Sequence, residues 1–319
     1  MKMQRSYRAT ALASLLTLVI AACAGSGGDT TITATGEILI DGSSTVGPLT
    51  EVAAELFEAE NQGVHVTVAI SGTGGGFQKF CIGETDGNDS SRPISDDEAV
   101  LCDSNGIGYD FVQFANDALT ILVNAELPVE CLTVDQVSQI WDNGSTVNTW
   151  GDVDGLDLPG EWASETLTPY GPGSDSGTFD FFTEVINGEV GQIRTDYHDI
   201  GEDDAQAVRA IETDPGATGY IPFSYFQEAG DLVKGLAIDD GNGCVEPTPD
   251  NVRDGTYTPL GRPLFVYFSD TALQRPEVLA FAEFYVENAV QIAELAEFVP
   301  MTEAQVDEAR AKVAALAGG

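Results

Sequence analysis

Short apolar runs and longer amphipathic stretches follow one another along most of the chain. The short runs predict strands at residues 37–40, 64–70, 109–115, 118–124, 218–223, 234–239 and 263–268. The amphipathic stretches predict helices at residues 48–60, 133–142, 178–186, 203–214, 276–298 and 303–316, and one more directly after residues 71–77. Strands that alternate with helices are typical of an α/β protein with parallel sheets.

The N-terminus carries the pattern of an export signal. Lys2, Arg5 and Arg8 precede an apolar run at residues 9–22, and Cys23 follows it. A positive head, an apolar core and small residues before a cut are typical of a signal peptide. A transmembrane anchor is the weaker alternative, because the run is shorter than the ~20 residues that a bilayer requires. The ending "IAAC" resembles a bacterial lipobox, which implies lipidation of the cysteine.

Cleavage before Cys23 would change the length and the net charge of the chain only slightly. Removal of residues 1–22 leaves 297 residues, and the net charge falls from −39 to −42 because the removed piece has three basic and no acidic residues. Residues 23–35 are small and polar, and they predict a flexible tether. We expect the remainder to be a soluble body outside the cytoplasmic membrane, with about two domains.

The charge balance excludes some partners more firmly than it identifies one. The chain has 52 acidic residues against 13 basic ones. No basic stripe is present that could neutralise phosphodiester groups, so nucleic acid is excluded as a partner. We interpret most carboxylates as a solvated surface that favours solubility or tolerance of salt.

Four cysteines follow Cys23, and their number is even. They are Cys81, Cys102, Cys131 and Cys244. None forms a CxxC motif, and neither histidine lies at ligand spacing to them, so a structural zinc site is not expected. An even count in an exported chain favours two disulfides, for which three connectivities are open. We favour the pairs Cys81–Cys102 and Cys131–Cys244.

Three loops share one design. "GSSTVGP", "SGTGGG" and "GSDSGT" each follow a predicted strand, carry glycines and hydroxyl side chains, and lead into a predicted helix. The start of a helix offers unpaired amides and the positive end of the helix dipole, and glycine allows a ligand to approach the backbone. Each loop alone is explained by ordinary helix capping. The three together predict a cradle for an anion.

Motifs of catalysis are not found. "GTGGGF" lacks the last glycine of a dinucleotide fingerprint, and no P-loop lysine-serine pair follows it. "GSDSG" has Asp175 at its centre where a nucleophile elbow has serine. "DVDGLD" lacks the later acidic ligands of a calcium loop. We therefore predict a protein that is not an enzyme and that requires no cofactor and no metal.

Arg92 is the candidate for positive charge at the cradle. It lies in the turn "SSRP", and a guanidinium presents a planar fork that matches two oxygens of a tetrahedral anion. The alternative is a surface arginine that pairs with a nearby carboxylate. Lys79, just after the glycine loop, is a weaker candidate.

The motifs, taken together, resemble those of a known family. "DGSSTVGPLTE", "SGTGGGFQKFC", "SSRPI" and "YGPGSDSGTFDFF", together with "CLTVDQVSQIW" and "RPLFVYF", are similar to the phosphate-binding proteins of bacterial phosphate-specific ABC importers. The resemblance implies a type II periplasmic binding protein fold, with two α/β lobes and phosphate held in the cleft between them. It implies a first lobe at residues 36–117 and 262–319 and a second at residues 118–261.

The resemblance also implies ligand residues. They are Ser44, Thr45, Thr73 (with Ser71 as a weaker member), Ser91, Arg92, Ser176, Gly177 and Thr178. Two departures from the family pattern stand out: Ser91 occupies the place of a ligand-accepting aspartate, and Pro172 that of an arginine. Our hypothesis is that Arg92 supplies the guanidinium and Asp175 the carboxylate.

A carboxylate at the site matters for selectivity. It accepts a hydrogen bond from a protonated phosphate, whereas sulfate offers no proton and would face an unpaired like charge. Asp86 and Asp89 are alternatives to Asp175 for this role, and a capping aspartate is the structural alternative for Asp175 itself.

The expected function is that of a receptor that delivers phosphate to an importer permease. We expect a monomer that is exported and contacts the membrane only through its lipid, on the outer side of the cytoplasmic membrane or in the periplasm. A receptor for another oxyanion, such as sulfate, molybdate or a phosphonate, is the alternative. A phosphoester hydrolase is a more remote one.

Overall fold

The computed structural model describes residues 35–174, 176–201 and 203–317. The predicted signal peptide and almost all of the predicted tether lie outside this range, as does Asp175. Within the described ranges, no helix combines the length and the apolar character needed to cross a bilayer.

The described chain alternates between strands and helices, as the sequence predicts. The strands are β1 (Gly36–Gly42), β2 (Val64–Ile70), β3 (Gly87–Ser90), β4 (Tyr109–Asn124), β5 (Cys131–Thr133), β6 (Thr168–Gly171), β7 (His198–Asp199), β8 (Ala217–Pro222), β9 (Val233–Gly235), β10 (Ala237–Asp239), β11 (Cys244–Val245) and β12 (Gly261–Ser269). The helices are α1 (Gly47–Glu60), α2 (Thr73–Phe80), α3 (Asp96–Asn105), α4 (Val134–Trp141), α5 (Gly177–Asn187), α6 (Asp204–Thr213), α7 (Phe223–Ala229), α8 (Pro249–Arg253), α9 (Asp270–Leu273), α10 (Pro276–Glu287), α11 (Ala289–Leu295) and α12 (Glu303–Ala317).

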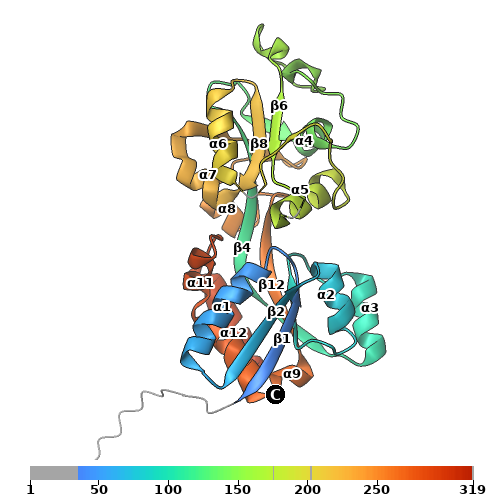
Figure 1. Ribbon diagram of the computed structural model, residues 1–319, viewed down its shortest axis with the longest axis vertical. Coiled ribbons are helices and arrows are strands. Elements are labelled where there is room, and N and C mark those ends of the chain that lie inside the picture. The colour runs from blue at the N-terminus through green and yellow to red at the C-terminus, as the bar shows by residue number, and fades with distance from the viewer. Residues whose placement is uncertain (1–34, 175, 202, 318–319) are drawn as a thin grey trace, which may run out of the picture. The chain divides into compact units, whose positions relative to one another are not determined.

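One long strand, β4, belongs to two groups of strands. Its first part pairs with β12 as far as Ala118, and its last part pairs with β8 from Leu119 onward. The strand order is β2-β1-β3-β12-β4-β8-β6-β7, with β9 also beside β4. Figure 1 shows β4 and β12 running between the group that contains β1 and β2 and the group that contains β6 and β8.

Each group of strands has its own hydrophobic core, which makes the chain two-lobed. In the first lobe, α1 and α10 cover the sheet, and Phe57 packs edge-on against Phe281 at 5.3 Å between ring centroids. In the second lobe, Phe182 of α5 stacks on Tyr220 of β8 at 3.7 Å. These rings are fully buried, so both cores gain the large hydrophobic stabilisation of aromatic burial. The prediction of a two-lobed α/β fold is confirmed.

Some predictions about the elements are wrong. The strands predicted at 109–115 and 118–124 are one strand, because Asn116 and Asp117 pair with β12 and stay extended. The predicted strand 234–239 divides between β9, which pairs with β4, and β10, which pairs with β5. The sheet is also mixed and not parallel throughout, because β12 runs antiparallel to both of its neighbours.

The favoured disulfide pairs are confirmed. Cys81–Cys102 joins the end of α2 to α3 within the first lobe. Cys131–Cys244 joins β5 to β11, the two outer strands of a small three-stranded sheet.

Candidate ligand-binding site

Three helices begin at one place between the lobes, and these are the helices that follow the three glycine- and hydroxyl-bearing loops. At α1, the Ser43 hydroxyl accepts from the amide of Thr45 at 3.1 Å. At α2, the chain enters through Gly72 with φ of 77°, and no side chain caps the first turn. At α5, the Ser176 hydroxyl accepts from the amide of Thr178 at 3.3 Å. First-turn amides have no partner within their own helix, so the starts of α2 and α5 present donors here. In α1, Pro48 has no amide hydrogen and the amide of Gly47 donates to the carbonyl oxygen of Ser43 at 2.9 Å, so this loop contributes chiefly through the hydroxyls of Ser44 and Thr45.

Glycine is required where the loops of the first lobe pack together. Gly42 has φ of 145°, and a Cβ there would lie 2.2 Å from the carbonyl oxygen of Asp89. A Cβ on Gly76 would lie 1.9 Å from Oδ1 of Asn88 and 2.6 Å from the Cα of Gly42. The β1–α1 loop and α2 therefore approach each other more closely than any larger residue allows.

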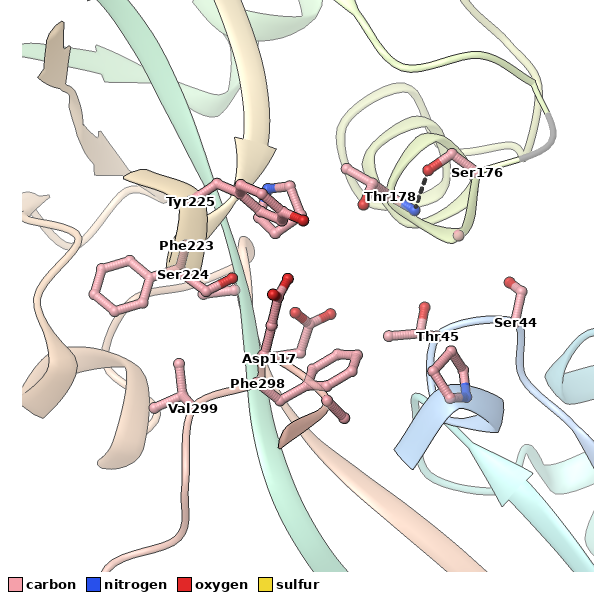
Figure 2. A pocket seen from close by; sticks show the side chains of 16 residues that line it. Ser44, Thr45, Asp117, Ser176, Thr178, Phe223, Ser224, Tyr225, Phe298 and Val299 are labelled. Carbon is pink, nitrogen blue, oxygen red and sulfur yellow. Dashed lines mark hydrogen bonds between the residues drawn. The ribbon is translucent and has the colours of Figure 1, made fainter. Parts of the chain in front are cut away.

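The loops enclose two adjoining cavities. The larger has a volume of about 550 Å³ and lies among the loops before α1 and α2, the turn that holds Ser91, and α5. The smaller, of about 210 Å³, lies on the side of Phe223 and Phe298. Ser44, Thr45 and Gly177 line both cavities. Figure 2 shows Ser176 and Thr178 at the start of α5 across the smaller cavity from Ser44 and Thr45.

The structure brings the described members of the predicted set together. Ser44, Thr45, Thr73, Ser91, Arg92 and Gly177 line the larger cavity, together with Ser71. Ser176 and Thr178 line the smaller one. The hydroxyls of Thr73 and Ser91 lie 3.2 Å apart, although 18 positions separate them in the chain. Asp175 cannot be placed, because it lies outside the described residues.

The alternative acidic residues do not line either cavity. Asp86 pairs with Arg275 at 2.8 Å. Asp89 is fully buried, and its Oδ1 accepts from the Thr50 hydroxyl at 2.8 Å. Lys79, the weaker basic candidate, pairs with Asp41. These groups have partners within the first lobe and line neither cavity.

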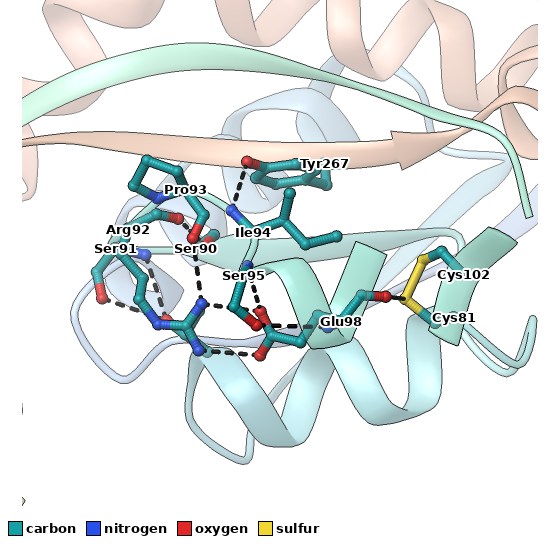
Figure 3. Close-up of polar contacts among 11 residues, drawn as sticks. Cys81, Ser90, Ser91, Arg92, Pro93, Ile94, Ser95, Glu98, Cys102 and Tyr267 are labelled. Atoms are coloured by element: carbon teal, nitrogen blue, oxygen red, sulfur yellow. Dashed lines mark hydrogen bonds and ion pairs between the residues drawn. A yellow bond between two sulfur atoms is a disulfide. The ribbon is translucent and has the colours of Figure 1, made fainter. Parts of the chain in front are cut away.

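Arg92 faces the larger cavity, but its guanidinium is already paired. Nη1 and Nη2 donate to the two carboxylate oxygens of Glu98 at 2.8 and 2.9 Å (Figure 3). Burial acts to raise the pKa of Glu98, but hydrogen bonds from Arg92 and from Ser95 outweigh it and leave that pKa lowered. The pairing with a nearby carboxylate, which the sequence left open as an alternative, is therefore present.

Sequence reasoning missed a second arginine at the cavity, Arg262. It lies in β12 directly opposite Asp117 of β4, at the end of the segment where these two strands pair. Its Nη2 donates to the Thr45 hydroxyl at 2.9 Å, and its guanidinium carbon lies 3.3 Å from the centre of the Phe181 ring. Arg262 thus contacts the first lobe through Thr45 and the second through Phe181.

Burial dominates the electrostatics of this pair. It raises the pKa of Asp117, against the effect of the neighbouring guanidinium, and it lowers the pKa of Arg262. The ordinary pKa of arginine is so high that the side chain stays charged at neutral pH even when burial lowers the pKa. The larger cavity therefore contains a cation that has lost most of its water.

The second lobe contributes acidic groups to the larger cavity. Asp180 and Glu184, both on α5, line it. Burial raises the pKa of Asp180, and the nearby Glu184 adds to the effect. A carboxyl group whose pKa is raised suits an acceptor for a ligand that still carries a proton.

The arrangement suits a small oxyanion. Helix amides, hydroxyls and guanidinium groups are donors, and donors of these kinds stabilise a tetrahedral anion. Among the described residues, no three His, Cys, Asp or Glu side chains gather as they would around a metal ion. Two lobes that share one donor-rich cleft define a solute-binding protein.

Comparison with known proteins identifies the family. A model described as a PBP superfamily domain matches residues 27–289. Protein SphX of Synechococcus elongatus is 39% identical over 267 residues, which are 83% of this chain and 77% of that protein. The phosphate-binding protein PstS of Staphylococcus saprophyticus is 34% identical over 316 residues, 98% of this chain and 95% of that protein.

A solved structure agrees with these relatives. The crystal structure of a possible phosphate binding protein from Planctomyces limnophilus has a TM-score of 0.83 and 40% identity, and it covers 89% of this chain and 99% of that one. This chain belongs to the family of phosphate-binding proteins within the PBP superfamily. The resemblance inferred from the sequence motifs is confirmed.

Proposed function

We propose that this protein is an extracytoplasmic receptor that binds inorganic phosphate between its two lobes and delivers it to an ABC importer. The observation that carries the proposal is the convergence of three helix starts with their glycines and hydroxyl side chains on one cleft, in a member of a phosphate-binding family. A binding role explains why amides, hydroxyls and guanidinium groups gather at one cleft.

The ligand set we propose is the one predicted from the sequence. It comprises Ser44, Thr45, Thr73, Ser91, Arg92, Asp175, Ser176, Gly177 and Thr178. In support, all of these except Asp175, which is not described, line one of the two adjoining cavities. Asp175 remains our sequence-based candidate for the acceptor of the ligand's proton, and Asp180 is a second candidate because it lines the larger cavity.

We also propose the lobe boundaries and the way the cleft closes. The first lobe comprises residues 36–117 and 262–319, and the second comprises residues 118–261. The change of partner of β4 between Ala118 and Leu119 supports this division. The two crossing strands, β4 and β12, would then bend as the lobes close on phosphate.

The cellular setting follows the N-terminal pattern. We propose that the signal peptide is removed before Cys23, that this cysteine is lipidated, and that the protein acts as a monomer on the outer side of the cytoplasmic membrane or in the periplasm. An importer permease would be its protein partner. These statements rest on the sequence motifs and on the proposed role.

Calorimetric titration of the mature protein with phosphate, arsenate and sulfate tests the proposal. We expect one saturable site for phosphate and a similar one for arsenate, which is also protonated at neutral pH. Sulfate should bind at least about a hundredfold more weakly, because an unpaired acceptor carboxylate costs several kcal/mol. Sulfate binding as tight as phosphate binding would refute the assignment, and release of p-nitrophenol from its phosphate ester would favour the hydrolase alternative.

A further inference from the structure

Two arginines line the larger cavity, and they differ in how much of their charge is available to a ligand. The side chain of Arg92 is 34% exposed, and both of its terminal nitrogens donate to Glu98 at normal distances for a charged pair. The side chain of Arg262 is 11% exposed. Arg92 is thus hydrated in part and neutralised at short range.

The counter-ion of Arg262 makes a looser contact. Nε and Nη2 both reach a single oxygen, Oδ2 of Asp117, at 3.3 Å each. Charged hydrogen bonds between such groups are usually shorter, about 2.7–2.9 Å. Nη1 has one long contact, at 3.5 Å to the carbonyl oxygen of Ser91, and no other partner among the described residues. The guanidinium is therefore desolvated without being fully compensated.

The position of Arg262 is also suited to a ligand. Its contacts with Thr45 and with the carbonyl of Ser91 place it beside the loop before α1 and the turn at Ser91. The Phe181 ring from the second lobe covers one face of the guanidinium and fixes its plane. Asp117 does not line the larger cavity but lines the adjoining smaller one, so it holds Arg262 from the side of the smaller cavity.

From this geometry we infer that Arg262, and not Arg92, supplies the principal positive charge to the bound oxyanion, and that Asp117 is a positioning residue that aims it. The inference rests on the proposed phosphate-binding function. Nη1 and Nη2 would each donate to an oxygen of the anion, and the contact with Thr45 would be shared with or replaced by the ligand. The remaining donors come from the amides and hydroxyls of the three loops.

The test is phosphate titration of matched arginine variants by calorimetry. Arg262→Met keeps the length and the packing on Phe181 but removes the fork, and we expect binding at least about thirtyfold weaker. Arg92→Met is the comparison variant, and we expect it to weaken binding clearly less than Arg262→Met does, because Glu98 already neutralises that guanidinium. Arg275→Met is the control, since Arg275 pairs with Asp86 and Glu277 and lines neither cavity, and its phosphate affinity should equal that of the wild type. A loss in Arg92→Met that equals or exceeds the loss in Arg262→Met would overturn the inference.

Removal of Arg262 also leaves Asp117 unpaired, and an unpaired carboxylate beside the cavities repels an anion by itself. The double variant Arg262→Met with Asp117→Asn separates the two effects. We expect it to stay at least about thirtyfold weaker than the wild type. If the double variant binds as tightly as the wild type, Arg262 serves only to neutralise Asp117, and the inference is wrong.

Folding and function are controlled in the same experiment. Thermal unfolding followed by circular dichroism verifies each variant, and Arg262→Lys keeps the charge if the methionine variant does not fold. Lysine lacks the planar fork, so we expect Arg262→Lys to bind at least about tenfold more weakly, and wild-type affinity in it would contradict the inference. If the wild type itself fails to bind phosphate, the proposed function fails as well, whereas tight binding by wild type and variant alike overturns this inference alone.

Discussion

Asp89 is a single buried residue that makes the stability of the fold depend on pH. Its Oδ1 accepts from Thr50, while Oδ2 has no hydrogen-bond partner among the described residues. Burial, with smaller contributions from Asp41 and Glu51, raises the pKa of Asp89 from its ordinary value of 3.8 to about 8. The carboxyl is therefore protonated in the folded protein at neutral pH.

The raised pKa predicts that Asp89 destabilises the fold as the pH rises. Between about pH 4 and pH 8, the folded state holds a proton that the unfolded state releases, so the free energy of unfolding falls with increasing pH. The slope is at most about 1.4 kcal/mol per pH unit, the value for one proton. We expect Asp89→Asn to remove this contribution, which urea unfolding of both proteins at pH 5 and pH 8 would measure.

Other groups titrate alike in the wild type and in Asp89→Asn, so their effect cancels in the difference between the two free energies of unfolding. The asparagine variant should gain stability relative to the wild type between pH 5 and pH 8. An identical difference at both pH values would mean that Asp89 titrates normally in the folded state.

At the scale of single residues, the sequence identified the ligand candidates that lie on the loops and missed Arg262. Ligand candidates on loops can be recognised from composition, because glycine and hydroxyl side chains before a helix are a local signal. Arg262 lies at the start of an apolar strand and 145 positions from Asp117, so nothing nearby in the chain indicates its role. Arg92 was chosen as the ligand arginine because of its motif, although the carboxylate of Glu98, six positions further along the chain, forms an ion pair with its guanidinium.

Among the elements, the small sheet of β5, β10 and β11 depends on a long-range crosslink. The Cys131–Cys244 disulfide closes a loop with a sequence separation of 113 residues. A crosslink across so long a loop restricts the unfolded chain strongly, and loss of such a bond typically costs roughly 2–5 kcal/mol. Neither cysteine lines the two cavities of the candidate site.

We predict that replacing Cys131 and Cys244 together by serine lowers the free energy of unfolding by roughly 2–5 kcal/mol. Phosphate affinity should change little, because the bond lies away from the cleft. Urea unfolding and calorimetry of the same preparation measure both quantities. A stability loss below about 1 kcal/mol would show that the small sheet holds these segments together without the bond.

Helices and strands were predicted well where the hydrophobic periodicity is strong. They were predicted poorly where the pairing with neighbouring strands sets the length or direction of a strand. Val64–Ile70 was predicted with its full bounds, since its alternation is clear. The division of β4 into two strands was wrong because polar Asn116 and Asp117 interrupt the apolar run, yet β12 pairs across them. The antiparallel direction of β12 could not be predicted, because strand direction in a sheet depends on the path of the whole chain.

For the whole molecule, the negative charge poses a question for an anion receptor. The chain carries a net charge of −39, which repels phosphate at a distance. Within the cleft, the helix amides, the hydroxyls and the buried guanidinium act over a few ångströms. Salt screens interactions beyond about 10 Å at 0.1 M but hardly affects such buried contacts.

We therefore predict that phosphate affinity depends little on salt. Between about 0.05 and 0.5 M sodium chloride, the dissociation constant should change by less than about threefold, because the screened part of the field is the repulsive part. Titration calorimetry at these two concentrations measures the effect. A loss of tenfold or more on adding salt would mean that long-range attraction drives the binding.

The sequence by itself determined the alternation of strands and helices, the three glycine- and hydroxyl-bearing loops and the family, because each depends on local periodicity, local backbone freedom or contiguous motifs. Only the tertiary structure decided how closely each of the two cavity arginines is paired with a carboxylate and that β4 serves both lobes. Pairing across β4 and β12 brings Asp117 and Arg262 together from distant parts of the chain. The free charge of a side chain depends on such neighbours, and the order of residues does not reveal them.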